Sequence, residues 1–204
     1  MLEQEGVNAI GFNFVRESPR FVSVDVARNI CARLSGNVLT VAVVANMSEH
    51  DVKDLLVQTG IRCVQFHGDE DPDFVAKFLP HAYKAIAIRE RKDVEVANVY
   101  PGEHLLVDAK VDGRLGGTGQ VFDWQLVKQL ASERKVTLAG GLSSENVAQA
   151  IAVVRPYCVD VASGVESSPG IKDRNKVSAF IRASYFTTEP SPDEPGRLPQ
   201  EILE

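Results

Sequence analysis

The chain has 204 residues, of which 44% are hydrophobic and 25% are charged, as is usual for one globular domain with a sizeable core. Its formal net charge of −6 argues against broad electrostatic binding to nucleic acid or to an anionic membrane. No apolar run is long enough to span a bilayer, and the acidic first residues do not resemble a secretory signal.

Short apolar runs alternate with amphipathic stretches along most of the chain. Residues 1–5 resemble the end of a helix that Gly6 stops. Runs such as 41–44 are apolar at successive positions, which is typical of parallel strands covered on both faces. The predicted strands are 9–14, 39–45, 63–67, 83–88, 104–109, 136–139 and 158–162.

Helices are predicted between these strands, and several have recognisable start and stop signals. Ser23 and Ser48 are expected N-caps, and Gly60 is expected to end the helix that follows Ser48. Ser143 or Ser144 is the expected cap of a later helix. The predicted helices are 24–34, 49–59, 71–79, 91–100, 123–130, 145–154 and 173–185.

This alternation predicts an α/β fold, either a parallel barrel or a doubly wound open sheet. Glycine-bearing loops recur after several strands, and no dinucleotide fingerprint follows the first strand, which favours the barrel. We therefore predict a TIM (β/α)8 barrel over residues 1–186, with the first strand missing from the chain as given. Residues 187–204 are rich in proline and acidic residues, and we expect a disordered tail.

The three cysteines are Cys31, Cys63 and Cys158. They are widely spaced, odd in number and set among apolar residues. These features predict buried thiols in a reducing cytosol rather than disulfides.

A barrel places its functional residues on the loops after its strands. Asp108 ends an apolar run, where a poorly solvated carboxyl suits a general acid, although a carboxylate there also often braces a loop. Arg20 follows the first strand and offers a bidentate donor for an anionic ligand. His67 ends the third strand, where a single histidine is more often structural than a ligand. No cluster of His, Cys or acidic residues has metal-ligand spacing, so no metal is expected.

Glycine turns follow three of the later strands. Gly116, Gly117 and Gly119 surround Thr118, so that backbone N–H groups can approach an oxyanion. Two further turns, at 140–141 and 163–164, follow consecutive strands, which is where barrels bind phosphate.

These segments together resemble phosphoribosylanthranilate isomerase, the tryptophan-pathway enzyme, over residues 1–184. The motifs appear in order as Gly11-Phe12-Asn13-Phe14, Ser18-Pro19-Arg20-Phe21, Val64-Gln65-Phe66-His67-Gly68, Leu106-Val107-Asp108, Gly116-Gly117-Thr118-Gly119, Phe122-Asp123-Trp124, Ala139-Gly140-Gly141-Leu142 and Val159-Asp160-Val161-Ala162-Ser163-Gly164-Val165-Glu166.

The resemblance implies a cytoplasmic isomerase that carries out an Amadori rearrangement without a cofactor. The aldose amine N-(5-phosphoribosyl)anthranilate becomes the corresponding 1-deoxyribulose 5-phosphate. The expected partners are this anthranilate-bearing sugar phosphate and either a second copy of the chain or another tryptophan-pathway enzyme, with no nucleic acid and no membrane. Asp108 matches the general acid. The implied substrate-binding residues are Arg20, His67, Gly117, Thr118, Gly140, Gly141, Ser163 and Gly164.

The chain departs from the family at its start. The family's first strand carries Lys-x-Cys-Gly, whose Cys is the general base, and no such segment occurs here. The positions of Cys31, Cys63 and Cys158, within a helix or at strand starts, do not allow them to replace it. A start codon assigned too late and a truncated, inactive paralogue that only binds a ligand or partner both account for this.

A different phosphate-binding barrel enzyme, indole-glycerol phosphate synthase, is a further alternative. That family needs lysines and a glutamate on its early strands. The early strands here end in Phe14, Ala45 and His67, which argues against it.

Overall fold

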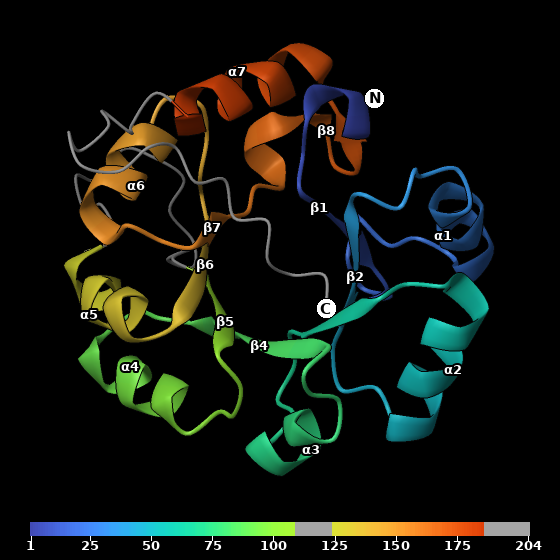
Figure 1. The fold of residues 1–204 in the computed structure, drawn as a ribbon, viewed down its shortest axis with the longest axis horizontal. Helices are drawn as coiled ribbons and strands as arrows, with labels where there is room; N and C mark the ends of the chain where they lie inside the picture. Colours follow the sequence, from blue (N-terminus) through green and yellow to red (C-terminus); the bar gives the residue numbers. More distant parts are fainter. Residues whose placement is uncertain (109–123, 186–204) are drawn as a thin grey trace.

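Seven parallel strands form one curled sheet at the centre of the molecule (Figure 1). The computed structural model describes residues 1–108 and 124–185. Within these residues the strands pair in chain order, each with the next. They are β1 (Ala9–Asn13), β2 (Leu39–Val44), β3 (Cys63–Phe66), β4 (Ala82–Ala87), β5 (His104–Asp108), β6 (Lys135–Ala139) and β7 (Cys158–Val159).

Side chains alternate between the two faces of this sheet. On the inner face, Val41, Tyr83, Ala85, Leu106 and Ala139 pack into one buried cluster. These residues come from β2, β4, β5 and β6 and fill the interior as in a packed barrel. Because the side-chain period of a strand is two, every second residue toward the ends of these strands also faces inward.

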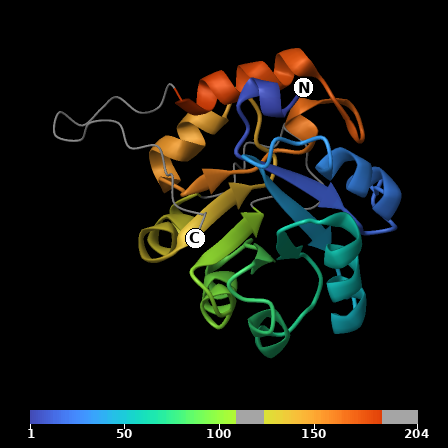
Figure 2. The same ribbon diagram turned by 45° about the vertical axis from the view of Figure 1, so that its right-hand side comes forward.

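Helices cover the outer face of the sheet and surround it as a ring (Figures 1 and 2). Two further apolar clusters lie between helices and strands, one in each half of the chain. The helices are α1 (Val24–Cys31), α2 (Glu49–Thr59), α3 (Pro72–Ala76), α4 (Arg91–Asn98), α5 (Gln125–Glu133), α6 (Val147–Val154) and α7 (Arg174–Tyr185). None in the described part is long and apolar enough to cross a membrane.

Local signals account for most of the helix ends. The hydroxyl oxygens of Ser23 and Ser48 accept hydrogen bonds from the first turns of α1 and α2, and Gly60 ends α2 in the left-handed conformation. The predicted cap of α6 is wrong. That helix begins after Asn146, whose side-chain oxygen accepts a hydrogen bond from the backbone N–H of Ser143.

The start and the end of the described chain meet on the outside of the sheet. Glu5, in the 3-10 helix η1 (Glu3–Glu5), accepts hydrogen bonds from Arg174 and Ser178 of α7. After β7 the chain forms the 3-10 helix η2 (Ser163–Val165) and the hairpin of β8 (Glu166–Ser168) and β9 (Ile171–Lys172). Within the described residues, β1 and β7 are the two edges of the central sheet.

The seven predicted strands and the barrel-type fold are confirmed. The cysteines are free thiols, but all three are only partly buried, so the prediction of buried thiols is wrong. Cys31 ends α1, and Cys63 and Cys158 are the first residues of β3 and β7. The predicted tail at 187–204 lies outside the described residues.

Candidate active site

The candidate site lies where the strands end. Because all seven strands are parallel, their carboxyl ends meet at one mouth of the curled sheet. In the register, Asp108 at the end of β5 lies beside Ala87 of β4 and Ala139 of β6. Residues at the ends of neighbouring strands therefore come together although they are far apart in sequence.

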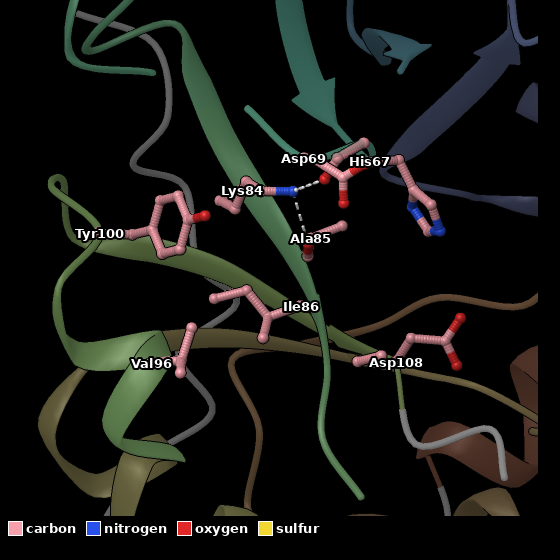
Figure 3. A pocket seen from close by; sticks show the side chains of 10 residues that line it. His67, Asp69, Lys84, Ala85, Ile86, Val96, Tyr100 and Asp108 are labelled. Atoms are coloured by element: carbon pink, nitrogen blue, oxygen red, sulfur yellow. Dashed lines mark hydrogen bonds between the residues drawn. The ribbon is translucent and has the colours of Figure 1, made fainter. Parts of the chain in front are cut away.

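A cavity of about 420 Å³ opens at this mouth and is lined by both His67 and Asp108 (Figure 3). Asp108 lies two residues after the inward-facing Leu106, so its side chain follows the inner face of β5. The structure thus brings together a histidine and a carboxylate that 40 residues separate in sequence. The catalytic role of Asp108 stays a prediction.

A buried ion pair supports the loop that follows His67. Lys84 and Glu70 are almost fully buried, with Nζ and Oε2 3.4 Å apart. The ammonium group of Lys84 donates to the carbonyl oxygens of Phe66, Gly68 and Ala85. Figure 3 shows Lys84 beside Ala85 on the wall of the cavity. Burial lowers the pKa of Lys84, and the charge of Glu70 acts in the opposite direction. The sequence did not predict this pair, because each residue sits alone in its own segment.

Glu70 connects that pair to the neighbouring loop. Its carboxylate accepts hydrogen bonds from the backbone N–H groups of Asn46 and Gly68. A Cβ atom on Gly68 would lie only 2.4 Å from the side-chain oxygen of Asn46, so no larger residue fits. The loops after β2 and β3 are therefore packed as one unit beside the cavity.

The two predicted phosphate-binding turns are in direct contact. A Cβ atom on Gly164 would lie 2.0 Å from the carbonyl oxygen of Leu142. Gly140 and Gly141 both have positive φ angles, which only glycine adopts readily. Ser163 is the first residue of η2. The structure thus unites Gly140, Gly141, Ser163 and Gly164, and their role in phosphate binding stays a prediction.

Arg20 is engaged by a partner from the far end of the chain. Its Nε and Nη2 groups donate to both carboxylate oxygens of Glu166 at 2.7–3.1 Å. Burial raises the pKa of Glu166, but hydrogen bonds from Arg20 and Lys172 outweigh it and hold the pKa at about 2. The predicted anion-binding arginine is therefore also a link between the loop after β1 and the hairpin after β7.

Asp160 is a second carboxylate at the mouth and is not among the site residues predicted from the sequence. It directly follows β7, and its backbone N–H donates to Leu138 at 2.9 Å. The residue is open to solvent, yet desolvation by surrounding protein atoms and the charge of Asp108 raise the pKa of its carboxyl group. Lys172 and His67 act in the opposite direction. The position of Asp160 directly after a strand, like that of Asp108 at the end of a strand, is the sequence signal that could have identified it.

Two of the predicted site residues, Gly117 and Thr118, lie outside the described residues. Within the described parts, no group of three or more His, Cys, Asp or Glu side chains is arranged to hold a metal ion.

The geometry defines a class of protein: a β/α-barrel enzyme with carboxylates and paired glycine turns at the carboxyl ends of its strands. Residues 2–183 match the family model described as N-(5'phosphoribosyl)anthranilate (PRA) isomerase. The isomerase of that name from Pseudomonas putida is 44% identical over 182 residues, which cover 88% of each chain. This chain belongs to the N-(5'-phosphoribosyl)anthranilate isomerase family.

Solved structures agree with this assignment. The crystal structure of phosphoribosyl anthranilate isomerase from Thermotoga maritima is 35% identical, with a TM-score of 0.82 over 90% of both chains. Another isomerase structure, in complex with reduced 1-(o-carboxyphenylamino)-1-deoxyribulose 5-phosphate, is 33% identical, with a TM-score of 0.79 over 90% of both chains.

Proposed function

We propose that this chain serves as N-(5'-phosphoribosyl)anthranilate isomerase in tryptophan biosynthesis. The reaction is an aldose–ketose isomerisation that converts the aldose amine to 1-(o-carboxyphenylamino)-1-deoxyribulose 5-phosphate. The observation that carries the proposal is the meeting of Asp108, His67 and two glycine turns at one mouth, in a chain that matches the family over residues 2–183.

Each of these groups has a task in that chemistry. Asp108 protonates the ring oxygen of the phosphoribosyl group, so that the furanose opens to a Schiff base. The backbone N–H groups around Gly141 and Gly164 hold the 5'-phosphate. The second proton transfer removes the C2 proton, and the resulting enolamine becomes the ketone.

The cysteines of this chain are unsuited to that second transfer. Burial raises the pKa of Cys63 to about 11 and also raises that of Cys158, so both remain thiols at neutral pH. Cys31 lies in α1, on the outside of the sheet. In the family resemblance the base is the Cys of a Lys-x-Cys-Gly segment, which these 204 residues do not contain.

The test separates binding from turnover. Calorimetry with the reduced product analogue is expected to show binding, and the same affinity is expected for Asp108→Asn. Turnover is measured for the chain as given and for a version with a Lys-x-Cys-Gly strand and loop placed ahead of residue 1. In the extended version, Asp108→Asn is expected to lower turnover by roughly 10²–10⁴-fold. Full activity of that variant would remove Asp108 from the mechanism, and analogue binding without turnover in any version would favour the inactive-paralogue alternative.

We also propose a cytoplasmic enzyme that acts as a homodimer or with another tryptophan-pathway enzyme. An isomerase from T. maritima with a solved structure, 32% identical to this chain, is dimeric. Sedimentation velocity over a range of concentrations checks the homodimer, which predicts a mass of twice 22.3 kDa.

A further inference from the structure

A buried row of polar side chains rises through the inside of the curled sheet to His67. Tyr83 on β4 and Gln65 on β3 are directly opposite in the strand register, and each is only 7% exposed. The hydroxyl group of Tyr83 donates to Oε1 of Gln65 at 3.2 Å. Nε2 of Gln65 lies 3.0 Å from Nδ1 of His67. Neither Tyr83 nor Gln65 is among the site residues predicted from the sequence.

This row determines which ring nitrogen of His67 carries hydrogen. An amide oxygen only accepts hydrogen bonds and an amide NH₂ group only donates them. In the structure, Oε1 of Gln65 faces the Tyr83 hydroxyl group and the NH₂ group of Gln65 faces His67. With the amide in this orientation, Nδ1 of His67 is the acceptor. In a neutral imidazole the single hydrogen then resides on Nε2.

The donor end of the row is itself fixed. Burial keeps the pKa of Tyr83 well above its ordinary value, so the phenol retains its hydrogen. The His104 ring stacks on Tyr83 with ring centroids 4.5 Å apart. Burial, with smaller contributions from Lys135 and Arg134, lowers the pKa of His104 to about 4, so this stacking partner is neutral at physiological pH. The backbone N–H of His67 donates to Val44 at 2.8 Å, which fixes the acceptor end.

We infer that Gln65, held by Tyr83, is a positioning residue that keeps His67 in the Nε2–H tautomer, with this N–H available to the substrate in the cavity beside Asp108. The inference rests on the proposed function for the identity of that substrate. The tautomer itself is a property of the ligand-free protein. It gives His67 a defined role as a hydrogen-bond donor to an oxygen atom of the sugar phosphate or its anthranilate carboxylate.

Long-range ¹H–¹⁵N NMR of the histidine rings tests the tautomer directly, and a His67→Asn sample assigns the His67 signals. In the unaltered chain the hydrogen is expected on Nε2. Gln65→Glu replaces the donor by an acceptor of the same shape, so hydrogen is expected on Nδ1. Gln65→Met removes the hydrogen bond, and a measurable fraction of the Nδ1–H form is expected; Tyr83→Phe is expected to give a smaller shift in the same direction. Gln149→Glu, the same chemical change on the exposed side of α6, is expected to leave the His67 signals unchanged.

Affinity for the reduced product analogue provides the second measurement. Gln65→Glu is expected to weaken binding by about 10–100-fold, the range known for residues that orient metal-binding histidines. Gln149→Glu is expected to leave the affinity unchanged. Circular dichroism and the thermal midpoint identify folded variants, and Gln65→Met serves if Gln65→Glu does not fold. An Nδ1–H tautomer in the unaltered chain, or an Nε2–H tautomer unchanged in every folded variant, would overturn the inference. If the unaltered chain shows the Nε2–H tautomer but binds no analogue, the proposed function fails while the positioning role stands.

Discussion

At the scale of single residues, charged groups at the mouth are held by partners from distant parts of the chain. Glu166 receives hydrogen bonds from Arg20, 146 positions earlier, and from Lys172. Lys84, which lines the cavity, forms a buried pair with Glu70. Such pairs hold loops in place, and their contribution to the free energy of unfolding depends on how completely water is excluded from them.

The Glu166 carboxylate makes folding dependent on pH. Its pKa is about 2 in the folded chain and 4.5 as its ordinary value, so its contribution is present above pH 4.5 and is lost as the pH falls toward 2. This difference corresponds to about 3 kcal/mol at neutral pH. We expect Glu166→Gln to lower the free energy of unfolding by about this amount at about pH 7, and by much less at about pH 2. Urea unfolding at both pH values checks this, and an equal loss at both would contradict the linkage.

Removing the cation of the buried Lys84–Glu70 pair is expected to cost much more stability than removing the cation of an ion pair on the surface. Lys84→Met leaves the Glu70 charge buried without its cation and is expected to cost about 3–5 kcal/mol. The matched control is Lys53→Met on α2, which removes an exposed pair with Glu49 and is expected to cost about 0.5 kcal/mol or less. Urea denaturation of both variants measures the difference. Similar losses would mean that Lys84 is not effectively desolvated.

At the scale of secondary-structure elements, the loops after β6 and β7 are assembled as one unit. Gly164 packs directly on the carbonyl group of Leu142, and the hairpin β8–β9 folds back so that Lys172 reaches the carbonyl oxygen of Ala162. The proposed phosphate site thus depends on the fit between two loops rather than on one glycine turn.

Gly164→Ala tests that fit. The added methyl group meets a backbone atom that cannot rotate away, so the loops must separate, at a cost of about 1–3 kcal/mol. We expect weaker binding of inorganic phosphate and of the product analogue. Gly11→Ala on β1 is the control, because its Cβ atom would meet only Val43 at an ordinary 3.6 Å. Unchanged phosphate affinity in Gly164→Ala would argue against a phosphate site between these loops.

At the scale of the whole molecule, the described sheet has a well-paired centre and two edges. β4 and β5 are paired on both sides, whereas β1 and β7 each have one neighbouring strand within the described residues. A strand that pairs with only one neighbour opens more easily than a strand paired on both sides, which exposes its backbone N–H groups to water. Contacts between η1 and α7 hold the outer layer together near these edges.

Hydrogen exchange is expected to follow this arrangement. Amides of β1 and β7 should exchange faster than those of β4 and β5, which open only with the whole domain. Exchange measured by mass spectrometry at two protein concentrations checks this. Protection of the edge strands equal to that of the centre at low concentration would contradict it, and protection that rises with concentration would indicate that a second copy covers the edges.

The family and the strand–helix order were predictable because their signals are local. Apolar runs, the caps Ser23 and Ser48, and Gly60 act within a few residues, and the structure confirms all of them. The cap of α6 was not predictable, because Asn146 competes with two serines within the same turn. Strand ends also indicated Asp108 and His67 as residues of one mouth, because a barrel brings such positions together.

The sequence by itself therefore determined the elements, their order and the family. Only the tertiary structure decided which side chains are partners: Arg20 with Glu166, Lys84 with Glu70, and Tyr83 with Gln65 and His67. The physical reason is that a hydrogen bond or ion pair depends on distance and on exclusion of water. Both are set by strand register and by loop packing, which join residues from 2 to 146 positions apart.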